Sequence, residues 1–339
     1  MKKLLFHIKS LQINKNKIWL FGYLFITFVI GGTIGALGFK YLATCKVKYV
    51  FINPSLGCSV DSNFDKSNPI VLKDKLTAFI NSETAKGDVS HVSVYFRDLK
   101  DGPTMGINED DLFISASLLK LPVALTYYKL SEDEMPDVLT RQLYFELGIG
   151  GGDNLQQFFK PAKSAIPGQT YLVNDLIKNS LIYSDNMSND VLKTYLATVG
   201  NATNQDYLLR TFKELGLIEP TSVTTSDIST RAYASIFRQL YNASYLNNED
   251  SEKVLSTLEQ SGFNLGIVAG VPKGIKVANK FGERDLGKEK QLHDCGIIYY
   301  PNNPYLICVM TRGYDYNVLT GVISQISNMT YAEMNSRAK

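Results

Sequence analysis

A serine and a lysine three residues apart form the first group in this sequence whose types and spacing suit catalysis. Ser117 and Lys120 lie in FISASLLKLPV, residues 113–123, which is typical of a strand end followed by a helix start. Three residues of separation place two side chains on one helical face. A serine attacks only when a nearby base removes its proton, and a lysine of lowered pKa can be that base. Alone the pair is a weak indication, because it also fits an exposed first helical turn.

Two further short motifs follow in the chain. The first is a Ser-Asp-Asn triplet in IYSDNMSND, and the second is a Lys-Phe-Gly triplet in ANKFGER. Taken singly, the first fits a plain turn between helices and the second fits a surface strand lysine. Their order after Ser117 carries more information than either motif alone. The residues of the two triplets are Ser184, Asp185, Asn186, Lys280, Phe281 and Gly282.

The three motifs together resemble the motif set of the class A β-lactamase-like serine hydrolases, the superfamily of serine β-lactamases and penicillin-binding proteins. The resemblance covers residues 70–339, and Ser-x-x-Lys and Ser-Asp-Asn are complete. It implies acyl transfer through an acyl-enzyme, with a β-lactam or a peptidoglycan stem peptide as substrate. It also implies that neither a cofactor nor a metal takes part.

The resemblance implies a role for each matched catalytic position. Ser117 is the expected nucleophile, and Lys120 is expected to take its proton. Ser184 would pass a proton to the departing nitrogen, and Lys280 from a facing strand would tune that hydroxyl. Acyl transfer needs such a nucleophile and proton shuttle, together with an oxyanion hole and a substrate anchor.

Four residues are expected to bind the substrate on the same grounds. Asn186 would offer its amide to the amide chain of the substrate. Phe281 and Gly282 belong to the strand motif beside the reacting bond. The backbone N–H groups of Ser117 and Glu283 would form the oxyanion hole, where losing one donor typically lowers the rate by about 10²–10³.

Two departures from the family pattern leave alternatives open. Phe281 stands where the family has Thr or Ser, so recognition of a substrate carboxylate is in doubt. Class A β-lactamases also carry a loop Glu for deacylation, and Glu219 is the sole carboxylate in the short segment 217–223. Without such a base the acyl-enzyme should persist, as in a penicillin-binding D-Ala-D-Ala carboxypeptidase. A non-catalytic wall-binding or sensor domain is a further alternative.

The N-terminus predicts a membrane location. Residues 1–48 hold eight lysines and no acidic residue, and residues 18–39 form an uncharged run long enough to span a bilayer as a helix. We expect a basic cytoplasmic tail at 1–17, an anchor at 18–39, a spacer at 40–69 and the catalytic domain at 70–339, outside the cytoplasm. A cleaved signal peptide is the rival interpretation.

Composition narrows the remaining possibilities. The chain has 339 residues, of which 45% are hydrophobic, enough for a sizeable core. Beyond residue 48 acidic residues outnumber basic ones, which argues against nucleic-acid binding. The four cysteines and three histidines show no zinc-ligand spacing.

Cys295 and Cys308 flank a hairpin turn at PNNP and are expected diagonally on one face, either as a disulfide or as two free thiols.

The predicted elements give an α+β fold. Apolar spacing predicts a helix over residues 70–86, and alternation predicts strands from His91 and before Ser117. The middle of the domain reads as helical, including a long helix over 225–246 capped at Thr225–Asp227, whereas short strands follow Gly270. We therefore expect a mostly antiparallel sheet with the terminal helices packed on it and a separate all-helical lobe, preceded by one transmembrane helix. Gly148–Asp153 is expected to be a loop and not a nucleotide-binding motif.

Overall fold

A computed structural model gives the structure of the chain, which divides into two units. The first is residues 1–48 with 57–59, and the second is residues 49–56 with 60–339. The structure describes residues 15–42, 49–56, 70–100, 102–146, 148, 154–217 and 227–337.

The first unit is described through one helix, α1 (Lys15–Leu42). Within the described ranges, no helix combines the length and the apolar character that crossing a membrane requires. The structure therefore does not support the anchor predicted over residues 18–39.

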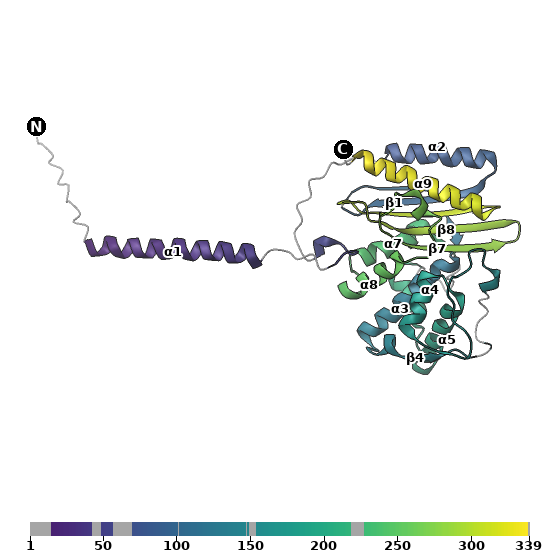
Figure 1. The fold of residues 1–339 in the computed structure, drawn as a ribbon, viewed down its shortest axis with the longest axis horizontal. Helices are drawn as coiled ribbons and strands as arrows, with labels where there is room; N and C mark the ends of the chain where they lie inside the picture. Colours follow the sequence, from purple (N-terminus) through teal and green to yellow (C-terminus); the bar gives the residue numbers. More distant parts are fainter. Residues whose placement is uncertain are drawn as a thin grey trace, which may run out of the picture. The chain divides into compact units, whose positions relative to one another are not determined.

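The second unit is built on a five-stranded antiparallel sheet in the order β2-β1-β9-β8-β7 (Figure 1). Strands from both ends of the domain meet in it, because β1 pairs with β9 along its whole length. The sheet and the helices around it confirm the predicted mixed α+β fold. The strands are β1 (Val89–Asp98), β2 (Thr104–Ile107), β7 (Val277–Leu286), β8 (Glu289–Ile298) and β9 (Tyr305–Gly313).

The two terminal helices of this unit, α2 (Ile70–Lys86) and α9 (Tyr316–Arg337), cover one face of the sheet (Figure 1). Successive side chains of a strand point to opposite faces. In β8, Leu292 and Ile298 pack with these helices, whereas Cys295 and Ile297 pack into the core on the opposite face. The sheet thus separates two apolar cores.

The opposite face carries the helical lobe. Here α7 and α8 lie against the strands, and the remaining helices pack on each other beyond them. Its helices are α3 (Lys120–Asp133), α4 (Val173–Ile182), α5 (Asn186–Thr203), α6 (Tyr207–Glu214), α7 (Thr230–Tyr241) and α8 (Asn248–Glu259). Two small antiparallel pairs complete it, β3 (Leu112–Ile114) with β6 (Asp227–Ser229) and β4 (Gln142–Tyr144) with β5 (Thr170–Leu172). Short 3-10 helices are η1 (Pro54–Leu56), η2 (Ala116–Leu119), η3 (Val138–Thr140), η4 (Asn154–Gln156) and η5 (Ile267–Gly270).

The long helix predicted over residues 225–246 is wrong at its start. Asp227–Ser229 forms the strand β6, in which the buried Ile228 pairs with Phe113. The helix α7 begins only at Thr230, and its cap is Ser229, whose side chain accepts a hydrogen bond from the N–H of Ala232. Burial of one apolar side chain in a strand pair therefore overrode the capping residues of the sequence pattern.

Part of the predicted spacer is packed against the domain. Phe51 and Ile52 are buried in the core of the helical lobe. The carboxylate of Glu252 on α8 accepts hydrogen bonds from the N–H groups of Val50 (2.7 Å), Phe51 (2.8 Å) and Ile52 (3.0 Å). The folded unit thus includes residues 49–56, upstream of the boundary predicted at residue 70.

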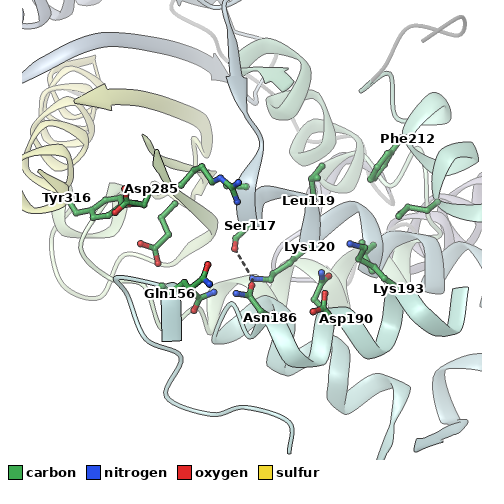
Figure 2. Close-up of a pocket in the computed structure, with 17 residues that line it drawn as sticks. Ser117, Leu119, Lys120, Gln156, Asn186, Asp190, Lys193, Phe212, Asp285 and Tyr316 are labelled. Carbon is green, nitrogen blue, oxygen red and sulfur yellow. Dashed lines mark hydrogen bonds between the residues drawn. The ribbon is translucent and has the colours of Figure 1, made fainter. Parts of the chain in front are cut away.

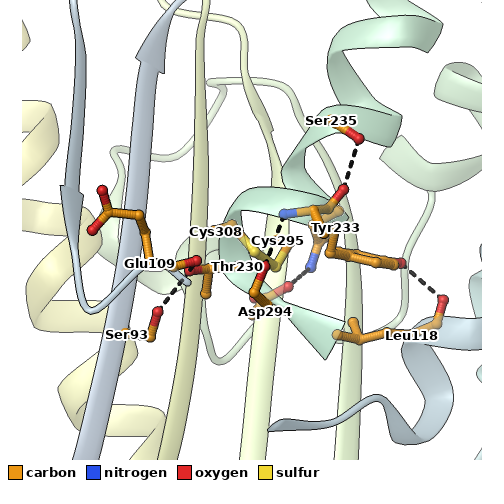
Figure 3. The surroundings of a disulfide bond; sticks show 12 residues. Ser93, Glu109, Leu118, Thr230, Tyr233, Ser235, Asp294, Cys295 and Cys308 are labelled. Carbon is orange, nitrogen blue, oxygen red and sulfur yellow. Dashed lines mark hydrogen bonds between the residues drawn. A yellow bond between two sulfur atoms is a disulfide. The ribbon is translucent and has the colours of Figure 1, made fainter. Parts of the chain in front are cut away.

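Cys295 and Cys308 form a disulfide between β8 and β9, on the face of the sheet that α7 covers (Figure 3). The two residues are direct partners in the strand register. The predicted diagonal arrangement was therefore wrong, because the two cysteines lie directly opposite each other across the strand pair. Of the two states left open by the sequence, the structure has the bonded one.

Glu252→Gln should loosen the attachment of residues 49–56. The amide nitrogen cannot accept a hydrogen bond, so at least one of the three N–H groups loses its acceptor and the others lose a charged one, which typically costs about 1–3 kcal/mol. We expect a fall of that size in the free energy of unfolding, together with faster amide exchange at Val50–Ile52. Asp175→Asn, at an exposed carboxylate whose contact with Lys178 is 4.0 Å long, is the control and should change neither. Unaltered exchange at these three amides in Glu252→Gln would contradict the assignment.

Candidate active site

Ser117 lies in the turn that joins β3 to α3. Ala116 before it has a φ of 48°, in the left-handed region that few non-glycine residues adopt. The buried hydroxyl of Tyr233 on α7 donates a hydrogen bond of 2.9 Å to the Leu118 carbonyl. This hydrogen bond holds the turn in a conformation that places Ser117 at the start of a helix, near the positive end of the helix dipole.

Side chains of the large sheet hold β3, the strand that leads to Ser117. The N–H of Ile114 donates to Gln291 Oε1 at 3.1 Å, and the carbonyl of Ile114 lies 3.0 Å from His293 Nε2. A carbonyl only accepts, so Nε2 carries the proton. Burial lowers the pKa of His293 to about 4, which keeps the ring neutral. Arg312 on β9 donates to the Leu112 carbonyl.

The Lys120 amine is the centre of the site. It lies 2.8 Å from Ser117 Oγ, 2.7 Å from the Ser184 carbonyl oxygen and 2.7 Å from Asn186 Oδ1. The last two atoms can only accept, so they bind two of the protons on the amine. The Ser117 hydroxyl can also donate, and a neutral Lys120 therefore presents its lone pair to the Ser117 proton.

The hydroxyl of Ser184 joins the two lysines of the site. Its Oγ lies 3.1 Å from Lys120 Nζ and 3.0 Å from Lys280 Nζ. Lys280 Nζ also donates to the carbonyl of Phe281, at 2.9 Å. A continuous chain of hydrogen-bonding groups therefore runs from Ser117 through Lys120 and Ser184 to Lys280.

Burial changes the protonation of both lysines. It lowers the pKa of Lys120 to about 7, against the opposing effect of Asp185 and Asp190. Lys280 is fully buried, and burial together with the nearby Lys120 holds its pKa well below the usual value. A lysine of pKa near 7 is a general base that works at neutral pH.

Asp185 fixes the turn that carries Ser184, whose φ is 56°. Its carboxylate caps α5 by accepting from the N–H groups of Met187 (3.3 Å) and Ser188 (2.8 Å), and it also accepts from Ser164 Oγ (2.6 Å). Burial opposes ionisation of Asp185, yet these hydrogen bonds hold its pKa below the usual value. The middle residue of the triplet thus acts on structure, as a buried anchor for its neighbours.

The segment 154–160 contacts both sides of the site, and no pattern in the sequence indicated this. Asn154 accepts from the N–H of Asn186 at 2.9 Å, and Gln157 Nε2 donates to the Ser184 carbonyl at 3.1 Å. At its other end, the carboxylate of Glu283 accepts from the N–H groups of two successive phenylalanines, at 3.1 and 3.0 Å. Of the adjoining glycine-rich run 148–153, the structure describes only Gly148.

A cavity of about 470 Å³ opens at Ser117, between the helical lobe and the end of β7 (Figure 2). Its floor is the turn with Ser117 and Lys120, and Tyr316 of α9 closes one end. Charged and amide side chains face it from both sides. From α5 these are Asn186, Asn189, Asp190 and Lys193, and from β7 they are Glu283, Arg284 and Asp285.

The structure brings together most of the residues that the motifs single out. Ser117, Lys120 and Asn186 line the cavity, the buried Ser184 contacts Lys120, and the buried Lys280 contacts Ser184. Glu283 also lines the cavity, and its carboxylate accepts from the N–H groups of Phe158 and Phe159, contacts that the prediction for its backbone N–H did not include.

Gly282 and Phe281 of the strand motif are not among the residues lining the cavity, and a further candidate, Glu219, is not described. A Cβ added to Gly282 would lie 3.0 Å from the backbone N of Leu118, so the glycine lets β7 approach the Ser117 turn closely. Phe281 is buried and stacks on Phe263 with ring centroids 4.1 Å apart. It is not among the residues lining the cavity, and its role in substrate binding stays a prediction. Glu219 lies outside the described residues.

Across the described ranges, no group of three or more His, Cys, Asp or Glu side chains is arranged to hold a metal ion.

Comparisons with known proteins agree on a family and a fold. The model of the beta-lactamase enzyme family matches residues 71–334. PBP-A has a similar structure, with a TM-score of 0.63, 20% identity, and coverage of 78% of this chain and 96% of that one. A β-lactamase from Chitinophaga pinensis gives 0.63 at 18% identity, covering 77% and 100%. A class A β-lactamase from Mycobacterium abscessus gives 0.61 at 18%, covering 78% and 99%. A search of curated proteins gave no match.

His293→Phe should weaken the docking of β3. The ring and its edge contact with Phe113 are kept, but the buried Ile114 carbonyl loses its donor, which costs about 1–3 kcal/mol. We expect a fall of that size in the free energy of unfolding, with faster amide exchange over Leu112–Ser117. His91→Phe is the matched control, because His91 also stacks on Phe113, whereas the hydrogen bond it loses, to Asp111 at 2.8 Å, is exposed. Equal effects of the two substitutions would count against a specific role for the His293 hydrogen bond.

Proposed function

Because this chain belongs to the beta-lactamase enzyme family, we propose that it is an active-site-serine hydrolase that forms an acyl-enzyme with β-lactams and hydrolyses their amide bond. The observation that carries the proposal is the 2.8 Å contact between Ser117 Oγ and the buried Lys120 amine. Two other close partners of that amine, the Ser184 carbonyl oxygen and Asn186 Oδ1, only accept, and the pKa of the amine is lowered to about 7. The site therefore holds a nucleophile and a base that is largely unprotonated above neutral pH.

Acylation begins with proton transfer from Ser117 Oγ to Lys120 Nζ while Oγ attacks the carbonyl carbon of the β-lactam. The backbone N–H groups of Ser117 and Glu283 are the proposed donors to the oxyanion that forms. The ring C–N bond then breaks, and the departing nitrogen takes a proton from the Ser184 hydroxyl. Lys120, within 3.1 Å of that hydroxyl, returns the proton that it received. The step ends with an ester at Ser117 and a neutral Lys120.

Lys280 supports this relay without entering it. Its amine is 3.0 Å from Ser184 Oγ and favours the transient negative charge on that oxygen. Asn186, one of whose amide atoms already binds Lys120, is proposed to hold the amide chain of the substrate with the other. Both roles come from side chains whose positions are fixed by burial or by hydrogen bonds.

A second candidate activity is that of a cell-wall peptidase acting on D-Ala-D-Ala-like stem peptides, with slow deacylation. The observation in its favour is the similarity to PBP-A, a mutant of which is described as an acyl-enzyme complex with penicillin G. The same nucleophile and relay serve both activities, which differ in how long the acyl-enzyme lasts. A non-catalytic wall-binding domain has no use for the complete proton relay from Ser117 to Lys280.

We also propose that the catalytic domain lies outside the cytoplasm. The disulfide between Cys295 and Cys308 supports this, because such bonds persist mainly in oxidising compartments. The single-pass membrane anchor over residues 18–39 stays a prediction from the sequence, based on its uncharged run and the lysines before it.

A fluorescent penicillin tests the acyl-enzyme. The full chain should acquire a covalent label at Ser117, seen by gel fluorescence and by peptide mass spectrometry, while Ser117→Ala acquires none. A chromogenic β-lactam added in excess should be turned over by the first protein only. Absence of both label and turnover in the unaltered chain would sink the proposal, and label that remains for hours without turnover would favour the peptidase.

The rate of acylation should rise with pH up to about 7 and then level off. Below its pKa, Lys120 is an ammonium without a lone pair, so the fraction of competent enzyme grows about tenfold per pH unit on that limb. Stopped-flow labelling across pH gives the profile. Asp294, whose pKa burial raises to about 7, titrates in the same range, so Asp294→Asn serves as the control and should keep the limb. A profile that is flat between about pH 5 and 8 would rule out Lys120 as the base.

A further inference from the structure

The segment 154–160, which we call the strap, is fastened to both walls of the cavity at Ser117. Gln156 and Gln157, in the middle of the strap, line this cavity (Figure 2). Two donors close the strap into a turn by binding its first carbonyl, that of Asn154. They are the N–H of Gln157 at 3.3 Å and Lys160 Nζ at 3.3 Å. Contacts at the two ends of the strap therefore act on one compact turn.

On the side of the helical lobe, the strap holds the turn that carries Ser184. Asn154 Oδ1 accepts a hydrogen bond from the N–H of Asn186 at 2.9 Å. Gln157 Nε2 donates to the Ser184 carbonyl at 3.1 Å, and Lys120 Nζ donates to the same oxygen at 2.7 Å. Because a carbonyl only accepts, this contact fixes which way the Gln157 amide points. The strap thus shares an acceptor with the proposed base.

On the side of the sheet, a single carboxylate holds the strap. Glu283 Oε2 accepts from the N–H of Phe158 at 3.1 Å, and Glu283 Oε1 accepts from the N–H of Phe159 at 3.0 Å. The ring of Phe159 packs against those of Phe263 and Phe281, with centroids 5.0 and 6.0 Å away. Two hydrogen bonds to a carboxylate and a group of aromatic rings therefore fix this end of the strap.

Glu283 stands at the point where the buried part of β7 ends. β7 is an edge strand, so in the described part of the chain one side of it has no strand partner. Gly282 lies against the Ser117 turn, whereas residues 284–288, which follow Glu283, are exposed. The hydrogen bonds between the Glu283 carboxylate and the strap therefore brace β7 where its packing stops.

We propose that Glu283 is a positioning residue, whose carboxylate fastens the strap so that the backbone N–H of the same residue is held at the oxyanion site. This inference rests on the proposed function, in which that N–H is one of two oxyanion donors. Because the carboxylate and the N–H belong to one residue, fixing the first restricts movement of the second. The strap in turn connects this donor to the Ser184 carbonyl on the opposite wall.

The precision of an oxyanion donor has a known effect on the rate. Loss of one such donor typically lowers the rate by about 10²–10³, and a misplacement of about 1 Å can cost about 10²-fold. The oxyanion exists in the transition state and not in the bound substrate. A loosened Glu283 should therefore slow the chemical step and leave substrate binding nearly unchanged.

Glu283→Gln in the full chain tests the assignment. One N–H of the strap loses its acceptor, because the new amide nitrogen can only donate. The maximal rate of labelling by a fluorescent penicillin should fall about tenfold or more. The penicillin concentration that gives half of this rate should change by no more than about twofold. Phenylboronic acid, whose adduct with a serine is tetrahedral, should lose affinity by a factor similar to the loss in rate.

Glu283→Asp separates the fastening of the strap from the charge. It keeps a carboxylate on a side chain one methylene shorter, so its loss in labelling rate should be similar to that of Glu283→Gln. The Glu283 charge also raises the pKa of Lys120. All rates are therefore compared at about pH 8.5, where Lys120 is largely neutral in each variant. Each rate refers to the fraction of chains that takes label, which removes misfolded protein from the comparison.

Two further variants test the connection and its specificity. Gln157→Ala loosens the strap at its lobe end, so combining it with Glu283→Gln should slow labelling by less than the product of the single effects. Glu252→Gln is the matched control, because Glu252 also accepts from successive N–H groups but does not line the cavity. Its labelling rate should stay within about twofold of the unaltered chain.

The outcomes that contradict the proposal are distinct. Labelling of Glu283→Gln within about twofold of the unaltered rate would overturn it, as would a loss confined to the half-saturating concentration. Normal labelling in Glu283→Asp, with a loss in Glu283→Gln, would assign the effect to charge. Fully multiplicative effects of Gln157→Ala and Glu283→Gln would contradict the connection through the strap. If the unaltered chain takes no label at Ser117, the proposed function itself has failed.

Discussion

The site depends on one constraint, the removal of the Lys120 amine from water. An ammonium buried at this depth is costly unless acceptors surround it, so the fold supplies the Ser184 carbonyl, Asn186 Oδ1 and two hydroxyls. Those acceptors come from a turn that Asp185 fixes and from the start of α5. The same burial brings the pKa down to about 7. Packing of the lobe against the sheet is therefore also what makes the lysine a base.

Lys280, on the sheet side of the site, is likewise buried and has a lowered pKa. In β7 it points toward the helical lobe, whereas the next residue, Phe281, packs on the face covered by α9. Alternation along one strand thus divides the motif between two cores. Gly282 then brings the strand close to Leu118, which sets the distance between the two halves of the site. A single strand in this way joins Lys280, the second core and the Ser117 turn.

Whether a feature of the fold or the site could be predicted depended on how far apart in the sequence its interacting residues lie. The sheet, the terminal helices and the grouping of Ser117, Lys120, Ser184 and Lys280 followed from periodicity and ordered motifs. The β3–β6 pair, the hydrogen bonds of His293 to β3 and those of Asn154 to the Ser184 turn did not, because they join residues distant in sequence with no local pattern. The packing of Phe281 against Phe263 was not predictable for a similar reason. Its surroundings depend on which face of β7 it occupies, and a motif does not state that.

The segment that Glu252 holds has a practical consequence for where the polypeptide can be cut. Proteolysis ahead of Tyr49 leaves all three N–H contacts and the buried Phe51 and Ile52 in place. A fragment starting at residue 70, as hydrophobic periodicity alone suggests, loses them and uncovers apolar surface on the helical lobe. Recombinant forms of the domain should accordingly keep these residues, and shorter ones are expected to be less soluble.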